Sequence, residues 1–191
     1  MPTASGESTP LRGLFSGSKF KGTQRSGRSS YDVEVELQDV DIDRSFLCGY
    51  LMISGLTEDY PTLTTYFEAE IVGEHYNFIT GKWEADENTD RDHWSKFPSF
   101  VEHVDNMRLA KGKIDPRTSD NVYMRWKEHF LVPDHRVVSI AGASFAGFYY
   151  ICYERSTAAI LGFYFHQSSE MFQSLRLKHV PQRSFPTFKF R

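Results

Sequence analysis

The stretch Tyr31-Asp-Val-Glu-Val-Glu-Leu-Gln38 decides the fold class of this chain. Its odd-numbered positions are apolar and its even-numbered positions are Asp, Glu and Gln, and this period of two is typical of a β-strand with one buried and one wet face. A polar turn separates it from the apolar stretch Phe46–Ile53. The sequence therefore predicts that these two segments pair as an antiparallel hairpin.

Outward from this hairpin, the same criteria predict further strands over residues 63–72, 122–132, 136–140, 145–153, 159–165, 175–180 and 187–190. Between residues 86 and 107 the apolar spacing changes to three or four, which predicts a helical insertion capped at Asp86, Glu87 or Thr89. Pro98 should divide it, because proline lacks an amide hydrogen. We expect a mainly β chain that forms a closed antiparallel barrel of the lipocalin or calycin type, since closure leaves few exposed strand edges.

A length of 191 residues favours a single domain. Residues 1–30 are rich in Ser, Gly, Thr and Pro, so we expect most of them to be mobile, with Ser16–Phe20 anchoring the end. The expected organisation is a flexible arm over 1–15 and one domain over 16–191. Neither a secretory signal nor a run of about 18 apolar residues is evident, so we expect an intracellular protein, cytoplasmic or also nuclear.

Charge is distributed unevenly along the chain. The chain has 22 basic and 25 acidic residues, and its two end segments, 1–30 and 175–191, together contain ten of the bases and one of the acids. The remaining 12 bases and 24 acids give residues 31–174 a net charge of −12. Such a body repels phosphate backbones and attracts cations. We expect neither a nucleic-acid nor a membrane partner, and a basic or cationic ligand fits better.

Several kinds of chemistry find little support in the sequence. Cys48 and Cys152 are too few for a disulfide framework, and neither they nor the seven histidines show metal-ligand spacing, so we expect no metal or cofactor. Ser144 lies between Gly142 and Gly147, but a nucleophile elbow needs glycine two residues after the serine, not three. We expect no catalysis. These small residues suit either the close approach of a bound backbone or tight packing.

The segment Tyr123-Met-Arg-Trp-Lys-Glu-His-Phe130 places a carboxylate on an apolar face, because strand alternation groups Met124, Trp126, Glu128 and Phe130. Burial of an unpartnered carboxylate costs several kcal/mol. Glu128 should therefore face a wet lumen, pair with an internal cation, or await a cationic ligand. Together with the aromatic-rich segments 148–150 and 163–165, Glu128 is typical of an ammonium-binding pocket. A lipocalin-like carrier of a small apolar or amine ligand is an alternative function.

Five blocks carry a resemblance to a known family: Ser16-Gly-Ser-Lys-Phe20, Gly55-Leu-Thr-Glu-Asp-Tyr-Pro-Thr-Leu-Thr-Thr65, Phe130-Leu-Val-Pro-Asp134, 142–152 and 162–169. The chain resembles the vacuolar import and degradation protein family from about residue 16 to residue 191. The resemblance implies an antiparallel barrel that binds the first residues of a peptide. It also implies a substrate receptor of the GID (CTLH) E3 ubiquitin ligase. Such a receptor recognises proteins that begin with proline and has no catalytic role of its own.

The same resemblance assigns roles to individual residues. Glu128 should pair with the N-terminal ammonium of the peptide, Tyr149 should hydrogen-bond the same nitrogen, and Gln173 should reach a carbonyl further along. Gly142 and Ser144 should contact the peptide backbone. The remaining peptide-binding positions that it implies are Val33, Ile53, Leu56, Leu63, Thr65, Ile140, Phe145 and Tyr164.

The end of the chain has an expected partner of its own. In the family, the C-terminal tail docks on a scaffold subunit of the ligase, and Phe188, Phe190 and Arg191 match the aromatic and basic character of such a tail. A plain edge strand over these residues is the other interpretation.

Overall fold

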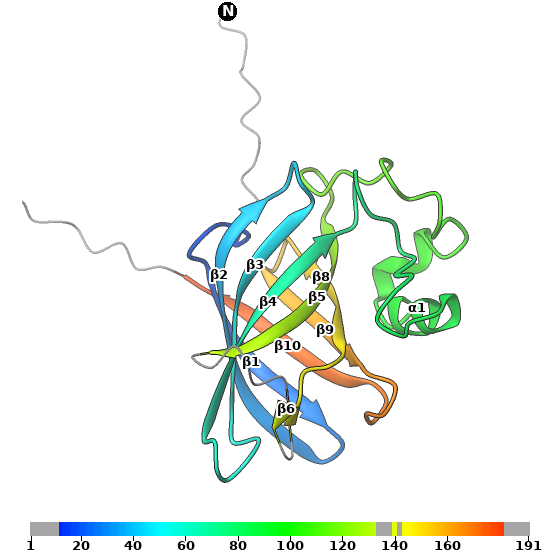
Figure 1. Ribbon diagram of the computed structural model, residues 1–191. Coiled ribbons are helices and arrows are strands. Elements are labelled where there is room, and N and C mark those ends of the chain that lie inside the picture. Colours follow the sequence, from blue (N-terminus) through cyan, green and yellow to red (C-terminus); the bar gives the residue numbers. More distant parts are fainter. Residues whose placement is uncertain (1–11, 133–138, 141–142, 182–191) are drawn as a thin grey trace, which may run out of the picture.

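The computed structural model describes residues 12–132, 139–140 and 143–181, and it shows a closed antiparallel barrel with a helical insertion (Figure 1). The predicted fold class is confirmed. In spatial order the barrel strands are β1 (Lys19–Ser26), β10 (Gln173–Val180), β9 (Ala159–Phe165), β8 (Phe148–Glu154), β5 (Asn121–Val132), β4 (Thr62–Ile71), β3 (Phe46–Ser54) and β2 (Ser29–Asp41). The strands β6 (Ser139–Ile140) and β7 (Ala143–Ser144) form a separate two-stranded sheet.

Strand β1 closes the barrel by pairing with β2 on one side and with β10 on the other. The sequence predicts a mobile arm for most of residues 1–30, and over β1 this expectation is wrong. Two residues of β1, Phe20 and Gln24, are buried. The inward position between them is Gly22, which adds no apolar side chain to the pattern. Gly22 is required there, since a Cβ at this position would overlap the carbonyl oxygen of Arg176. The apolar alternation is therefore too sparse to reveal the strand.

The two ends of the barrel differ. The connections 27–28, 55–61 and 166–172 lie at one end with residues 139–140 and 143–147, and we call this end the mouth. At the opposite end, β1 begins and β10 ends, because Lys19 pairs with Val180. The segment before β1 covers that end: Leu14 is buried with the lumen side chains, and the amide of Gly17 donates to the carbonyl of Leu37 over 2.7 Å.

The predicted helical insertion connects β4 to β5 and packs on the outside of the barrel wall (Figure 1). Helix α1 (Glu87–Trp94) begins at the predicted cap Asp86, which forms a capping box with Thr89. The predicted division at Pro98 is also confirmed, since this residue begins the short 3-10 helix η1 (Pro98–Glu102). Trp94 packs edge-on against Tyr150 of β8, and the insertion and the outer wall thus share a second apolar core.

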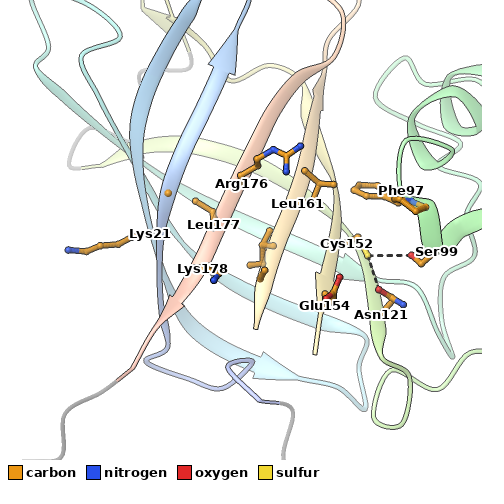
Figure 2. A pocket seen from close by; sticks show the side chains of 14 residues that line it. Lys21, Phe97, Ser99, Asn121, Cys152, Glu154, Leu161, Arg176, Leu177 and Lys178 are labelled. Atoms are coloured by element: carbon orange, nitrogen blue, oxygen red, sulfur yellow. Dashed lines mark hydrogen bonds between the residues drawn. The ribbon is translucent and has the colours of Figure 1, made fainter. Parts of the chain in front are cut away.

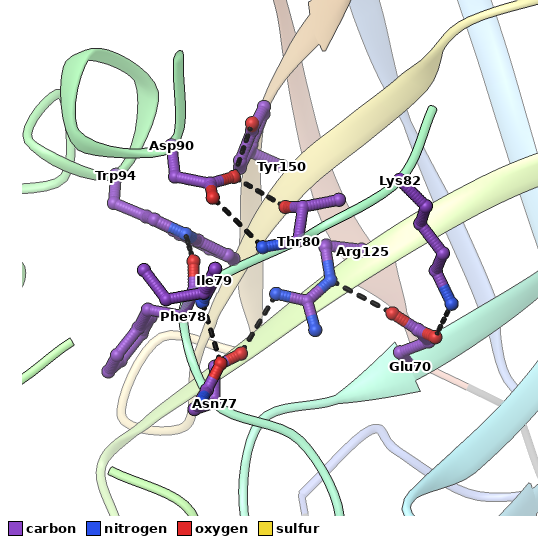
Figure 3. Close-up of polar contacts among 10 residues, drawn as sticks. All are labelled: Glu70, Asn77, Phe78, Ile79, Thr80, Lys82, Asp90, Trp94, Arg125 and Tyr150. Carbon is purple, nitrogen blue, oxygen red and sulfur yellow. Dashed lines mark hydrogen bonds and ion pairs between the residues drawn. The ribbon is translucent and has the colours of Figure 1, made fainter. Parts of the chain in front are cut away.

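Buried polar groups join the insertion to the wall (Figure 3). Asp90 of α1 is fully buried, and its carboxylate accepts hydrogen bonds from the amide and hydroxyl of Thr80 and, over 2.8 Å, from the hydroxyl of Tyr150. Nearby, the guanidinium of Arg125 is 3.0 Å from Glu70. Burial raises the pKa of Asp90, because desolvation outweighs these hydrogen bonds.

Two predicted strands lie partly or wholly outside the described residues. Of residues 136–140, only Ser139–Ile140 is a described strand, and it pairs with β7 instead of joining the barrel. The predicted strand over residues 187–190 lies outside the described residues.

The substitution Tyr150→Phe should destabilise the fold by about 1–3 kcal/mol, because it removes one donor from a fully buried carboxylate. The free energy of unfolding in urea measures this loss. The matched control is Tyr50→Phe on β3, whose half-buried side chain has no comparable carboxylate partner among the described residues. Equal effects of the two changes would contradict this account of Asp90.

Candidate functional site

A β-bulge on β5 sets the orientation of the functional side chains. The strand pairs Phe130 with Tyr66 but Glu128 with Phe67, so His129 is an extra residue opposite β4. The bulge reverses the alternation beyond it. Phe130 therefore stacks on Tyr66 outside the barrel, with ring centroids 5.0 Å apart, and the prediction that it shares the inner face with Glu128 is wrong.

The Glu128 carboxylate is buried in the barrel, where the side chain is 6% exposed. It accepts a hydrogen bond from the hydroxyl of Thr65 on β4. The neighbouring cation does not neutralise it directly: the ammonium of Lys127 donates to the backbone carbonyls of Glu128, over 2.8 Å, and Phe145, over 3.2 Å. Among the described residues no cationic side chain forms an ion pair with this carboxylate. Of the three alternatives for Glu128, pairing with an internal cation is therefore not found among the described residues.

Desolvation dominates the ionisation of this carboxyl. Burial raises the pKa of Glu128 to about 7, while the hydrogen bond from Thr65 and the charge of Lys127 act in the opposite direction. Near neutral pH the site therefore exchanges a proton readily. A cation placed beside the carboxylate would favour its charged form.

Tyr149 lies beside Glu128 on the adjacent strand β8, where it pairs with Trp126. Its hydroxyl donates to the side-chain oxygen of Gln24 over 2.7 Å, and the amide nitrogen of Gln24 donates to the side-chain oxygen of Gln173 over 3.4 Å. Because the phenolic hydrogen points to Gln24, the oxygen of Tyr149 is left able to accept a further hydrogen bond.

The sequence did not predict Gln24 as a site residue. It lies on β1, within the segment expected to be mostly mobile, and a buried glutamine in a polar stretch has no distinguishing motif. Closure of the barrel places it beside Tyr149.

Tyr164 of β9 lies next to Tyr149, with ring centroids 5.1 Å apart. Its hydroxyl accepts a hydrogen bond from the amide of Gly147 over 2.9 Å. A Cβ at Gly147 would overlap the carbonyl oxygen of Phe165, so this glycine serves tight packing of the chain against itself. Of the two roles considered for small residues in this stretch, packing accounts for Gly147.

Most of the predicted peptide-binding residues lie together in the mouth half of the barrel. Its polar members, from six different strands, are Gln24, Thr65, Glu128, Tyr149, Tyr164 and Gln173. Its apolar members share the lumen cluster or pack against it: Val33, Ile53, Leu56, Leu63 and Phe145. We call the first set the polar half of the mouth and the second set the hydrophobic half.

The other predicted residues are placed less fully. Ile140 and Ser144 belong to the β6–β7 hairpin, which lies in the connection from β5 to β8 at the mouth (Figure 1). Gly142 of the same connection lies outside the described residues, as do the predicted docking residues Phe188, Phe190 and Arg191.

The cysteines and the metal-binding residue types form no further site in the described part of the chain. Cys48 and Cys152 are free and buried, and burial raises the pKa of Cys152 to about 12. The described part of the chain contains no group of three or more His, Cys, Asp or Glu side chains placed to hold a metal ion. Nor does any of its helices have the length and apolar character to cross a bilayer.

Comparison with known proteins identifies the family. Residues 13–180 match the family model described as "Vacuolar import and degradation protein". The chain belongs to the vacuolar import and degradation protein family. The match spans the whole barrel and its insertion, and it agrees with the resemblance found in the sequence.

Relatives in the family extend across fungi and animals. The glucose-induced degradation protein 4 homolog of Mus musculus is 55% identical over 179 residues, which cover 93% of this chain and 82% of the mouse protein. The GID complex substrate-recognition subunit 4 of Schizosaccharomyces pombe is 35% identical over 93% of this chain and 96% of its own length. The protein of the same name from Saccharomyces cerevisiae is 33% identical over 90% of this chain and 65% of its own length.

The raised pKa of Glu128 makes stability depend on pH. The pKa of this carboxyl is about 7 in the folded state and 4.5 in the unfolded chain, so the folded state binds the proton more tightly. The contribution of this proton to the free energy of unfolding is therefore complete below pH 4.5 and is lost as pH rises through about 7. Above that, the ionised carboxyl costs about 3 kcal/mol. Glu128→Gln should therefore be more stable than the wild type at pH 8, by up to about this amount, and nearly equal to it at pH 4.5.

Urea unfolding at several pH values measures this difference. The exposed Glu36 on the outer face of β2 provides the control Glu36→Gln, which should not change the pH profile. A stability difference for Glu128→Gln that stays constant from pH 4.5 to pH 8 would show that the carboxyl does not titrate as described.

Proposed function

We propose that this chain is the non-catalytic substrate receptor of a GID-type E3 ubiquitin ligase in the cytoplasm or nucleus, and that it binds the free N-terminal proline of target proteins in the barrel mouth. A relative of nearly the same length, from Schizosaccharomyces pombe, is named as a GID complex substrate-recognition subunit, which supports the role in the ligase. The observation that carries the ligand chemistry is the buried Glu128 carboxylate, whose hydrogen-bond partner is the neutral hydroxyl of Thr65.

An N-terminal ammonium suits this arrangement of acceptors. The proline nitrogen is cationic and carries two hydrogens, so Glu128 accepts one and the hydroxyl oxygen of Tyr149 accepts the other. The charged donor then offsets the desolvation that raises the pKa of the carboxyl. Lysine or arginine side chains would bring the same charge, but their long stems do not match a pocket that encloses a terminal residue.

The proline ring suits the hydrophobic half of the mouth. The ring is compact and apolar, and its φ angle is fixed before binding, so little conformational entropy is lost. Val33, Ile53 and Leu63, all buried at the mouth, would contact it. Gln173 and the β6–β7 hairpin, with Gly142 and Ser144, would then hydrogen-bond the following peptide residues.

The position at which β10 ends suits assembly into a ligase. Strand β10 ends opposite the mouth. A tail bearing Phe188, Phe190 and Arg191 would therefore dock on a scaffold subunit from the far end of the barrel. The mouth would remain open to substrates while the receptor is held.

A calorimetric titration with a short peptide that begins Pro-Gly tests the ligand. We expect a micromolar dissociation constant, about −8 kcal/mol, because few groups contribute and the loops must be ordered. Acetylation of the peptide and the substitution Glu128→Gln should each abolish measurable binding, since loss of one partner of a buried charged pair costs about 2–5 kcal/mol. Glu36→Gln is again the matched control.

Two outcomes would contradict this proposal. Equal binding of free and acetylated peptides would remove the N-terminal ammonium from recognition. Failure of the free peptide to bind, with a small amine retained in the purified protein, would favour the carrier function.

Binding should also depend on pH in a defined way. Below about pH 7 the Glu128 carboxyl takes up a proton in the empty site, so affinity should fall by up to tenfold per pH unit. At or above about pH 8 the ligand amine begins to lose its charge. We expect the highest affinity between these limits, measured by titration at several pH values, and a profile without an acid limb would argue against Glu128 as the acceptor.

A further inference from the structure

From a groove on the outside of the barrel, we infer a second recognition site that binds an acidic peptide segment of a partner protein with an apolar side chain between its acids. The groove has a volume of about 580 Å³ and runs across the outer faces of β9 and β10. It lies on the other side of the wall from the lumen, so it is independent of the mouth.

One side of the groove carries two exposed cations, Arg176 and Lys178, which are successive outward residues of β10 (Figure 2). Their cross-strand neighbours are not acidic: Lys178 pairs with Lys21 and Ala159, and Arg176 pairs with Thr23 and Leu161. Like charges directly opposite one another are unfavourable. Within the described part of the chain, neither Arg176 nor Lys178 forms an ion pair.

The acidic residues close to the groove, Glu34 and Glu154, already have partners. Glu34 of β2 is paired with Lys21, whose ammonium points away from the groove and lies 3.2 Å from the carboxylate. Glu154 lines the far end, about 10 Å from Lys178 at two strand spacings. Its carboxylate accepts hydrogen bonds from the hydroxyls of Ser156 and Thr157, over 3.0 Å and 3.1 Å. The two cations of β10 are thus left to an external anion.

The opposite side of the groove is apolar. Phe97 of the insertion forms a wall and Leu161 of β9 forms the floor, and the exposed Pro98 and Ala159 also line the groove. Cys152 lies deeper, where Ser99 and Asn121 contact its thiol, and burial keeps that thiol protonated. A ligand that fills the groove therefore needs an apolar group toward the insertion and negative charge toward β10.

The spacing of the cations indicates the form of the ligand. Successive outward residues of a strand are about 7 Å apart, so Arg176 and Lys178 match two carboxylates on an extended segment or on neighbouring turns of a helix. Every barrel strand is paired on both sides, so the groove presents no free backbone edge. Recognition must therefore act through side chains.

A partner protein explains these features better than the other available occupants. The chain's own residues 182–191 contain Arg183, Lys189 and Arg191 and no acid, so they would be repelled. An anionic membrane is less suited, because the cations flank a concave groove that a flat lipid surface would not fill. An acidic segment is complementary in both charge and shape.

A library of short N-acetylated peptides, in which Asp or Glu flanks Leu, Phe or Trp at different spacings, tests the inference. Acetylation excludes the peptides from the site proposed in the mouth. We expect fluorescence anisotropy to show saturable binding of acidic members and none of their lysine counterparts. The double substitution Arg176→Glu/Lys178→Glu should weaken binding by roughly tenfold or more.

The control variants distinguish loss of binding at the groove from a general effect of the protein's net charge. Lys111→Glu/Lys113→Glu makes the same change in charge on an exposed loop of the insertion, and it should change affinity less than about twofold. Ala159→Trp keeps both cations but fills the groove, so it should also weaken binding. Circular dichroism confirms that each variant is folded, and titration of each with the proline peptide reports separately on the mouth.

Three results would overturn the inference. They are failure of every acidic peptide to bind, equal loss of binding in the two double variants, and binding of phosphatidylserine vesicles without binding of any peptide. None of them bears on the proline site, because the two sites are assayed with different peptides.

Discussion

Pairing between β1 and β10 is the contact on which the rest of the structure depends. It joins the first and last strands of an eight-stranded sheet, so that inward side chains of every strand surround one lumen. Without it, Gln24 would not reach Tyr149, and the polar half of the mouth would lose one of its six strands. The requirement for Gly22, which allows the carbonyl of Arg176 to approach, shows how little space this contact leaves.

The lumen formed in this way holds a carboxylate that is only partly compensated. Glu128 has a neutral hydroxyl partner, and the adjacent ammonium of Lys127 is turned to backbone carbonyls. The free protein therefore holds an acceptor that a bound cation would stabilise. A site that is destabilised when empty and satisfied when filled is a reasonable arrangement for a receptor, because affinity then depends on the charge of the ligand.

The barrel also separates its surfaces. The mouth lies at one end, β1 begins and β10 ends at the other, and the insertion is fixed to the outer wall by Asp90 and by an aromatic core. The outer groove uses that fixed insertion as one side. The mouth, where we propose that substrate binds, and the outer groove, where we infer an acidic partner, therefore do not overlap.

The sequence by itself determined the fold class, the hairpin of β2 and β3, the insertion with its cap and its break at Pro98, and the family, because these depend on local periodicity and motifs. It also pointed to Glu128 as a carboxylate on an apolar face. Only the tertiary structure decided that β1 closes the barrel, that Gln24 orients Tyr149, and that a bulge at His129 turns Phe130 outward. Each of these arises from pairing between strands distant in sequence, where register and packing, which leave no local pattern, determine which side chains meet.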